Sequence, residues 1–257
     1  MTLIAALPMY DWPEVRDETD ARWNVMRKDL RKKQIEAPER LVRRNDEMPP
    51  VPGGIRDENG NLIAPDPATL PPEGLDLAVL WHHPSLLLAE TCWGPMGLGL
   101  QRHVNVIGQS DYQGILGGSG EYYSSAVIAR KNGREQVAPP VDGSAVLPMA
   151  ELLGGRFAYN EMRSLSGYLS LRNDLQAAGE TLSIFSESIE TGAHRTSIKA
   201  VADGVADFAA IDCKSLMLAQ RFDQEAAEVE VIGWTAWRKG IPYIRARSVT
   251  VNAALII

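Results

Sequence analysis

Cysteine is scarce in this sequence, and neither copy is spaced to bind a metal. Cys92 and Cys213 are the two cysteines among 257 residues, and they form no CxxC motif and no Cys/His ligand spacing. A structural zinc site requires four such ligands at characteristic spacings, so we predict no metal site. We expect both cysteines to be buried free thiols. A disulfide between them stays an alternative, because sequence alone does not decide pairing.

Long apolar runs are also missing. A helix needs about 20 apolar residues to span a bilayer, and no stretch reaches that length, so we expect no direct membrane insertion. Residues 1–7 carry no basic region and are too short for a signal peptide, and we interpret them as the first strand. Two locations therefore stay open: either the chain works in the cytoplasm, or an export signal lies outside this sequence.

An excess of basic charge is absent as well. Lys and Arg number 26 against 33 Asp and Glu, and the resulting net charge of −7 argues against a nucleic-acid-binding surface. Basic residues between 27 and 44 are interleaved with acidic ones, which is typical of a solvated helix face. The glycine motifs GxxxxGKS/T and GxGxxG do not occur, so nucleotide chemistry is not expected and no cofactor is predicted.

Strand-like and helix-like segments alternate along the chain. The length of 257 residues suffices for one large domain or for two lobes of about 100–150 residues each. Buried strand patterns such as 207–212 alternate with helical patterns such as 213–222, which predicts an α/β protein with mostly parallel sheets flanked by helices. Residues 36–74 are rich in proline and form either a flap or subunit contact, or a plain surface excursion.

Local signals add three smaller expectations. Asp11 lies three residues before Glu14 and is suited to cap a helix that ends near Lys33. The Asn59-Gly60 pair favours a tight hairpin turn. Residues 182–185 are expected to form a strand at a sheet edge.

The stretch Ser164-Leu165-Ser166-Gly167-Tyr168 joins a short apolar run, 155–160, to a helical pattern, 169–175. The first backbone N–H groups of a helix have no partner within the helix, and the helix dipole places partial positive charge there. Such a turn is suited to bind an oxyanion through N–H groups and hydroxyls. The structural alternative is that Ser164 or Ser166 only caps the helix.

Three further strand ends carry polar side chains. Ligands of open α/β sheets bind beyond the carboxyl ends of strands, where Tyr10-Asp11, His194 to Ser197 and Asp212 are expected to lie. Each of these positions also has a structural interpretation. His194 would be a satisfied histidine, Thr196 and Ser197 would cap a helix, Asp212 would cap the next helix, and Tyr10 would belong to the core.

Residues 191–212, TGAHRTSIKAVADGVADFAAID, closely resemble a segment of the phosphate/phosphonate ABC-transporter substrate-binding proteins. The Ser164–Tyr168 stretch is similar to the S-x-S-G-Y anion loop of that family. Residues 7–11, 86–95 and 123–125 resemble further family segments in the same order. The resemblance covers most of the chain, apart from about residues 36–74 and about the last ten.

The family resemblance implies a two-lobed periplasmic-binding-protein-like fold of type 2, with two hinge strands. Lobe 1 would comprise residues 1–122 and 233–257, and lobe 2 would comprise 123–232. It also implies a non-enzymatic solute-binding protein that captures a small oxyanion, such as phosphonate or phosphate, in an interlobe cleft for an ABC permease. Its location would then be periplasmic. The alternatives are a cytoplasmic ligand sensor of the same fold or an enzyme built on it, in which His194, Ser166 and Asp212 would mimic a triad.

The resemblance assigns ligand-binding roles residue by residue. Ser164, Ser166 and Gly167 would cradle the anion, and Tyr168 would cover it. His194 would donate a hydrogen bond, and Asp212 would accept one from a protonated oxyanion or a ligand amine. The remaining implied ligand-binding residues are Thr196, Ser197 and Ser125, together with Tyr10 and Thr91 of the first lobe.

The sequence departs from the family pattern at a few positions. Leu165 stands where a small polar residue is common, which removes a possible donor, and Trp93 stands where glycine is common, which would narrow the cleft. The proline-rich insert and the short segment 253–257 are further departures. These differences bear on the identity of the ligand more than on the fold.

Overall fold

A computed structural model describes residues 2–250 and separates the chain into two compact units. Unit 1 combines the residues up to Ser110 with the described residues from Ile241 onward, and unit 2 is the continuous segment Asp111–Gly240. The chain therefore passes between the units twice. The boundaries proposed from the sequence, after 122 and before 233, both fall within unit 2. Segment 253–257 lies outside the described residues.

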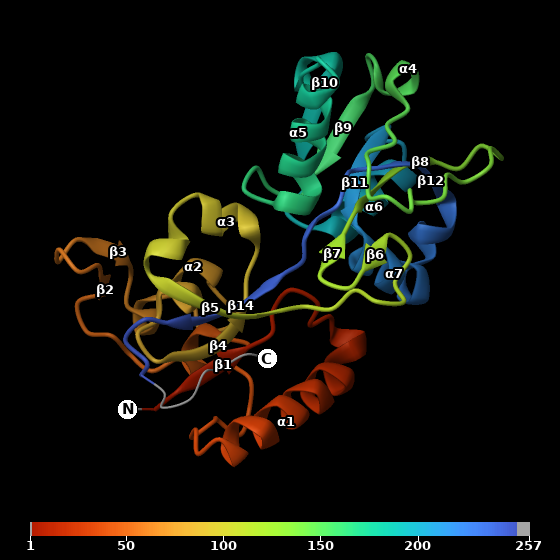
Figure 1. The fold of residues 1–257 in the computed structure, drawn as a ribbon. Helices are drawn as coiled ribbons and strands as arrows, with labels where there is room; N and C mark the ends of the chain where they lie inside the picture. The colour runs from red at the N-terminus through yellow and green to blue at the C-terminus, as the bar shows by residue number, and fades with distance from the viewer. Residues whose placement is uncertain (1, 251–257) are drawn as a thin grey trace. The chain divides into compact units, whose positions relative to one another are not determined.

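The framework of unit 1 is a four-stranded sheet in the order β1-β4-β14-β5, which Figure 1 shows. Its strands are β1 (Ile4–Ala6), β4 (Leu86–Glu90), β14 (Pro242–Ala246) and β5 (Val104–Gln109). β1 and β4 are parallel, whereas β14 is antiparallel to both of its neighbours. All five residues of β4 are buried, as expected for a strand covered on both faces. The predicted α/β class is confirmed. The sheet of unit 1 is mixed, because β14, which the chain forms after it leaves unit 2, runs antiparallel to β4 and β5.

Helix α1 (Arg16–Lys32) follows a 3-10 turn, η1 (Pro13–Val15), and ends close to the predicted position. Its buried face carries Trp23 and Leu30, which are 1% and 2% exposed. Asp11 does not cap this helix, and that prediction is wrong. No side-chain cap is present at Trp12, the N-cap of η1, or at Val15, the N-cap of α1. The Asp11 carboxylate instead pairs with Arg43.

The proline-rich insert is an ordered part of unit 1. Strands β2 (Ile55–Arg56) and β3 (Leu62–Ala64) form the predicted hairpin, with Gly60 at φ 83°. Short 3-10 turns, η2 (Asn45–Glu47) and η3 (Pro67–Thr69), lie on either side of the hairpin. Side chains of the insert join the hydrophobic core of unit 1, namely those of Ala37, Leu41, Val42, Met48, Ile55 and Ala64. The insert is therefore more than a surface excursion.

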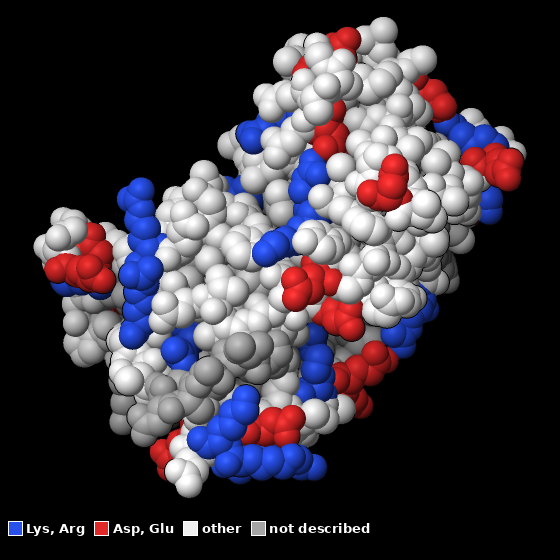
Figure 2. All heavy atoms as spheres, viewed as in Figure 1, with Lys and Arg blue, Asp and Glu red and all other residues white. Residues whose placement is uncertain are grey.

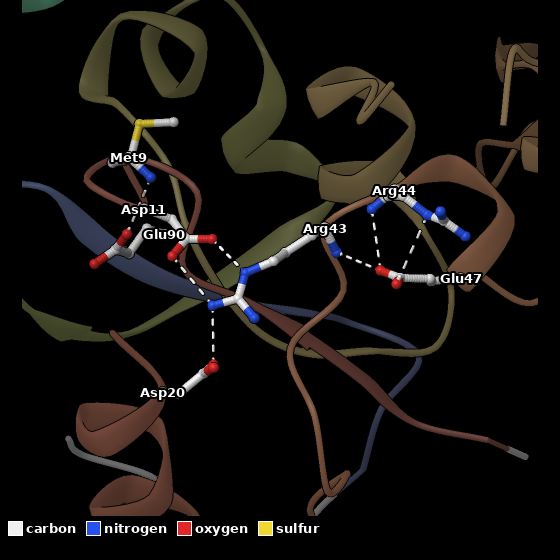
Figure 3. A network of polar contacts seen from close by, with 7 residues as sticks. All are labelled: Met9, Asp11, Asp20, Arg43, Arg44, Glu47 and Glu90. Carbon is white, nitrogen blue, oxygen red and sulfur yellow. Dashed lines mark hydrogen bonds and ion pairs between the residues drawn. The ribbon is translucent and has the colours of Figure 1, made fainter. Parts of the chain in front are cut away.

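Polar contacts also anchor the insert, as Figure 3 shows. The Arg43 guanidinium donates to Asp11 Oδ1 at 3.1 Å and to Asp20 Oδ1 at 2.9 Å. The pKa of Arg43 is raised because both carboxylates stabilise its charge. The Glu47 carboxylate accepts hydrogen bonds from two backbone N–H groups, those of Arg43 and Arg44. The insert is thereby tied to α1 and to the segment that follows β1.

Three short helical segments complete unit 1. They are α2 (Leu77–His82), α3 (Trp93–Gly97) and η4 (Leu100–Arg102). Trp93 is the first residue of α3, and its partly buried side chain packs against the core of unit 1.

Unit 2 is built on a five-stranded sheet in the order β10-β9-β11-β8-β12. Its strands are β10 (Glu187–Glu190), β9 (Arg156–Tyr159), β11 (Phe208–Asp212), β8 (Ser125–Arg130) and β12 (Val229–Trp234). β10, β9 and β11 run parallel, and β8 runs antiparallel to β11 and to β12. A smaller sheet combines β13 (Arg238–Lys239), β7 (Tyr122–Tyr123) and β6 (Gly118–Ser119).

The helical segments of unit 2 include α4 (Met149–Leu152), the π-helical turn η5 (Leu165–Leu169) that continues into α5 (Ser170–Ala177), α6 (His194–Ala202), α7 (Cys213–Phe222) and the 3-10 segment η7 (Gln224–Glu228). Three helices of unit 2, α5, α6 and α7, follow the parallel strands β9, β10 and β11, and the other helical segments of unit 2 lie elsewhere along the chain. The strand expected at 182–185 is instead a 3-10 turn, η6 (Leu182–Ile184), so that prediction is wrong. The Thr181 side chain caps this turn by accepting from the Ser183 N–H, and such local caps favour a turn over a strand.

Charges of both signs are mixed on the surface. Figure 2 shows Lys and Arg side chains interspersed with Asp and Glu on the visible face. No helix within residues 2–250 is long and apolar enough to cross a membrane. Both cysteines are free thiols, as predicted, although Cys92 is only partly buried.

Candidate functional site

Most of the predicted ligand-binding residues lie at one edge of the unit 2 sheet. β9 and β11 are parallel, so their carboxyl ends meet at the same edge. β8 is antiparallel and begins there, which places Ser125 opposite Asp212 in the register. The chain segment after β10 lies at the same edge, because the Thr191 N–H donates to the Tyr159 carbonyl at 2.8 Å. This edge is the candidate site, and we call it the polar edge.

The serine-rich turn contributes a π-helical start to α5. Ser164 is the N-cap of the turn, and its Oγ accepts from the Gly167 N–H at 3.1 Å. The Leu169 N–H donates to the Ser164 carbonyl at 3.0 Å, which closes the wider turn. The cap interpretation of Ser164 is therefore observed directly, and this bond already engages the Gly167 N–H. Single π-helical turns occur often at functional sites.

Ser166 and His194 are joined across the polar edge. The Ser166 Oγ lies 2.9 Å from the His194 Nε2, and Ser166 is buried. His194 is the first residue of α6, so its ring lies beside the helix N-terminus. Burial lowers the pKa of His194, and the nearby Asp212 carboxylate only partly offsets this effect. The imidazole is consequently neutral at pH 7, with one ring nitrogen able to donate and the other to accept.

Asp212 has a structural role at the start of α7. Its Oδ1 accepts from the Lys214 N–H at 2.8 Å and from the Ser215 N–H at 3.0 Å. The side chain of Asp212 is buried, and its charge contributes to the field at His194. The structural alternative considered from the sequence, in which Asp212 caps α7, is therefore observed for its Oδ1.

The two hydroxyls in the first turn of α6 differ in exposure. Ser197 is fully buried, and its Oγ lies 2.6 Å from the Thr191 Oγ1, so it binds the segment that precedes the helix. Thr196 is exposed. Arg195 is half-buried, and its Nε donates to Asp223 at 2.9 Å.

The ring of Tyr168 lies over Tyr159 in β9. The two ring centroids are 4.8 Å apart, with the planes tilted by 53°. Tyr168 also packs against the hydrophobic core of unit 2. Its neighbour Leu165 is half-buried.

Tyr10 and Thr91 belong to unit 1. Tyr10 is 4% exposed, and Thr91 is fully buried at the end of β4, where its N–H donates to the Pro242 carbonyl at 3.1 Å. The Thr91 Oγ1 is buried without a hydrogen-bond partner. The prediction that these residues also contact the ligand stays a prediction.

The neighbouring Glu90 carboxylate is buried and carries a salt bridge that the sequence did not reveal. One oxygen lies 2.8 Å from Arg22, and the other accepts from the Met9 N–H at 3.1 Å, as Figure 3 shows for Met9. Burial has the largest single effect on the pKa of Arg22 and lowers it, but Glu90 together with Tyr243 and Tyr10 raises the pKa overall. This salt bridge neutralises both charges next to Thr91.

Three atoms at the polar edge are buried without a hydrogen-bond partner: Ser125 Oγ, His194 Nδ1 and Asn160 Oδ1. Buried polar atoms normally have a protein or solvent partner, so these three atoms keep hydrogen-bonding capacity for water or for a ligand. The sequence identified the first two and missed Asn160, although its position directly after a buried strand was a usable signal. Thr235, which follows β12, was also missed. It is fully buried, and its Oγ1 accepts from the Ser125 N–H at 2.8 Å.

Metal ligands do not gather at this edge or elsewhere in residues 2–250. No group of three or more His, Cys, Asp or Glu side chains in that range could hold a metal ion. The polar edge offers hydroxyls, an imidazole, a carboxamide, the Asp212 carboxylate and the N-terminus of α6 as binding groups.

Comparison with known proteins defines the class of protein first. Two solved structures of similar fold are binding proteins of type 2 periplasmic architecture. One is PhnD1 of Prochlorococcus marinus in complex with methylphosphonate, with 17% identity, a TM-score of 0.58, and coverage of 95% of this chain and 75% of that chain. The other is a binding protein component of an ABC phosphonate transporter from Pseudomonas aeruginosa, with 13% identity, a TM-score of 0.54, and coverage of 96% and 70%. These likenesses confirm the predicted fold class.

A family model then defines the family. The model described as "ABC transporter, phosphonate, periplasmic substrate-binding protein" matches residues 101–250, more than half of the chain. The chain belongs to this family, and the resemblance inferred from the sequence is confirmed. Its role is that of a solute-binding protein in ABC transport, since the family consists of substrate-binding proteins. Among curated proteins, no relative matches this chain.

Proposed function

We propose that this protein binds a small oxyanion, with a phosphonate as the first candidate, at the polar edge of unit 2 and passes it to an ABC permease. The observation that carries the proposal is the set of buried polar atoms without partners at that edge, Ser125 Oγ, His194 Nδ1 and Asn160 Oδ1. The methylphosphonate bound by the Prochlorococcus protein of similar fold supports the choice of ligand.

Apart from the Asp212 carboxylate, the binding groups at the polar edge are uncharged. The Ser125 hydroxyl offers one hydrogen to an anion, and the Ser166–His194 pair offers one more, because the bond between Ser166 and His194 uses the other hydrogen of the pair. The N-terminus of α6 adds backbone N–H groups and the positive end of the helix dipole. The nearby cation Arg195 is paired with Asp223, so its charge is compensated. Recognition would thus rest on hydrogen bonds, and Thr196, Ser197, Tyr10 and Thr91 are further predicted contributors.

Binding without catalysis fits the geometry of Ser166, His194 and Asp212. In a serine-type triad the carboxylate accepts a hydrogen bond from the histidine Nδ1 and orients the ring as a base. Here His194 Nδ1 has no hydrogen-bond partner, and Asp212 Oδ1 accepts from two N–H groups of α7. The serine and histidine therefore form a hydrogen-bonded pair with one hydrogen left for a ligand, and we propose that the protein is not an enzyme.

A calorimetric titration of the full chain with methylphosphonate and with inorganic phosphate tests the proposal. We expect binding of at least one, and stabilisation by about 2.7 kcal/mol at a ligand concentration 100 times Kd. Ser166→Ala should weaken binding about tenfold or more, because it removes a hydrogen bond to a charged group. Ser188→Ala is the matched control, since Ser188 is exposed on β10. No binding of phosphate, phosphite, phosphonates or carboxylates would contradict the proposed function.

A further inference from the structure

We propose that Asn160 is a specificity-determining residue whose carboxamide oxygen accepts a hydrogen bond from the ligand. The site would then select an oxyanion that carries its own hydrogen, such as a hydrogen phosphonate or hydrogen phosphate, over a sulfonate or sulfate. This inference rests on the proposed function, because it assigns the ligand class of the same polar edge.

The position of Asn160 is fixed by the backbone on both sides. It directly follows β9, whose last residue, Tyr159, pairs with Glu190 in β10. The Asn160 carbonyl accepts from the Gly192 N–H at 2.9 Å, and Gly192 lies two residues before His194. The side chain is therefore held between the end of β9 and the start of α6.

The Asn160 carboxamide lies against the serine-rich turn. A Cβ atom built on Gly167 would lie 1.9 Å from Asn160 Oδ1 and 3.2 Å from His194 Cε1. Asn160, Gly167 and His194 thus meet at one point, and only glycine leaves room for the carboxamide there. Despite this close packing, the Asn160 Oδ1 has no hydrogen-bond partner.

The hydrogen-bonding capacity of the polar edge shows what Asn160 adds. The hydroxyls of Ser125 and Ser166 both donate and accept, and a neutral imidazole does the same through its two nitrogens. A carboxamide oxygen only accepts. Asp212 was the predicted acceptor, and one of its two carboxylate oxygens, Oδ1, already accepts from the Lys214 and Ser215 N–H groups. Asn160 Oδ1 is therefore an unused acceptor among groups that otherwise favour an anion.

An acceptor in an anion site distinguishes ligands by their hydrogens. A phosphonate or phosphate that retains one proton presents an O–H that Asn160 Oδ1 can accept. A sulfonate has the same tetrahedral shape but carries only acceptor oxygens at neutral pH, so its oxygen would face the Asn160 oxygen. A site built to bond a ligand hydrogen rejects an analogue that lacks it, because a buried group is then left unpaired.

The test compares methylphosphonate with methanesulfonate, and phosphate with sulfate, by titration of the full chain. For the wild-type protein we expect affinity for each phosphorus ligand to exceed that for its sulfur counterpart at least tenfold. Asn160→Leu has a similar shape but no acceptor, and it should reduce this preference to about threefold or less. Asn160→Asp restores an acceptor and should retain the preference. Asn173→Leu on α5 is the matched control, because Asn173 is exposed.

The possible results separate this inference from the proposed function. Equal affinity of the wild-type protein for methylphosphonate and methanesulfonate would overturn the role of Asn160 and leave an oxyanion-binding function intact. Full preference in a folded Asn160→Leu variant would also overturn it. Failure of all four ligands to bind would overturn the proposed function itself. Circular dichroism shows whether Asn160→Leu folds. If it does not fold, the inference would be overturned by equal wild-type affinities or by loss of the preference in Asn160→Asp.

Discussion

At the scale of single residues, packing and hydrogen bonding limit which residue can occupy a few positions. Gly167 is one of them, because a Cβ there would lie 1.9 Å from Asn160 Oδ1. His83 is another. Its ring accepts from the Ser85 N–H at 3.1 Å, and its Nε2 lies 2.9 Å from the Pro49 carbonyl, so it holds the proline-rich insert. Substitution at either position should therefore change the stability of the protein measurably.

Gly167→Ala should disturb the polar edge. The added methyl group would displace Asn160 or the serine-rich turn, and overpacking of this kind costs about 1–3 kcal/mol. We expect a lower melting temperature and a loss of oxyanion affinity of about tenfold or more. Thermal unfolding and calorimetry measure the two effects. Gly97→Ala is a suitable control, because nothing lies within 4 Å of a Cβ built at Gly97. An unchanged Gly167→Ala protein would show that Asn160 does not occupy this space.

His83 should make stability depend on pH. Burial lowers the pKa of His83, although its contact with Pro49 and the nearby Asp66 charge act in the opposite direction. Because the folded pKa is below the unfolded value of about 6.5, the stabilisation is complete above that pH. It is lost as the pH falls through the unfolded value to the lowered folded one. Each unit of difference corresponds to about 1.4 kcal/mol.

The measurement is urea unfolding of wild type and His83→Gln at pH 7 and pH 5. Glutamine can still donate and accept hydrogen bonds but does not titrate. We expect the free energy of unfolding of the wild type to fall more steeply on acidification than that of the variant. His82 and His194 also have lowered pKa values, so the variant should retain part of the pH dependence. Equal slopes for the two proteins would rule out a contribution from His83.

At the scale of elements, helix starts organise the polar edge. η5, α6 and α7 all begin beside the ends of β9, β10 and β11, and each start places different polar groups there. Ser164 and Asp212 are N-caps that satisfy backbone N–H groups, whereas the α6 N-cap, Ala193, offers no side-chain cap. The start of α6 is therefore the helix terminus best suited to an anion.

Removing the cap of α7 should cost stability. Asp212→Ala deletes the acceptor for two N–H groups, and loss of an N-cap typically costs about 1 kcal/mol. Asp212→Asn keeps a capping oxygen and should cost less. Chemical denaturation compares the two variants with Asp142→Ala, which alters an exposed turn. If Asp212→Asn is as destabilising as Asp212→Ala, the charge of Asp212 contributes more than its cap.

At the scale of the whole molecule, the two units differ in how the chain builds them. Unit 2 is one continuous segment with its own five-stranded sheet, whereas unit 1 needs residues from both ends of the chain. A continuous unit with a separate core is able to fold independently. The hydrophobic core of unit 2 is formed by residues from β8 to β12, such as Val127, Phe157 and Ile232.

We expect residues 111–240 to fold when produced alone. The measurement is thermal unfolding followed by near- and far-ultraviolet circular dichroism, which should show one cooperative transition. Residues 1–110 alone lack β14, which lies between β4 and β5, and should not fold cooperatively. A fragment 111–240 without a cooperative transition would contradict this division of the chain.

Local patterns in the sequence predicted much of this molecule. An apolar run marked β11, and spacing marked α1 and α7, because these patterns depend on neighbours within a few residues. The serine-rich turn was recognised from its position between a strand and a helix. The expected strand at 182–185 failed because the Thr181 cap, a local alternative, prevailed over the apolar pattern.

The sequence by itself determined the α/β class, the order of most elements, the family, and the residues Ser166, His194 and Ser125 as candidate ligand donors. Tertiary structure alone decided which polar atoms keep a free hydrogen-bonding capacity. Asp212 Oδ1 is engaged by α7, while Asn160 Oδ1 and His194 Nδ1 are left without partners. The reason is physical: strand direction and register bring these groups together from distant parts of the chain, and a hydrogen bond depends on that placement rather than on residue type.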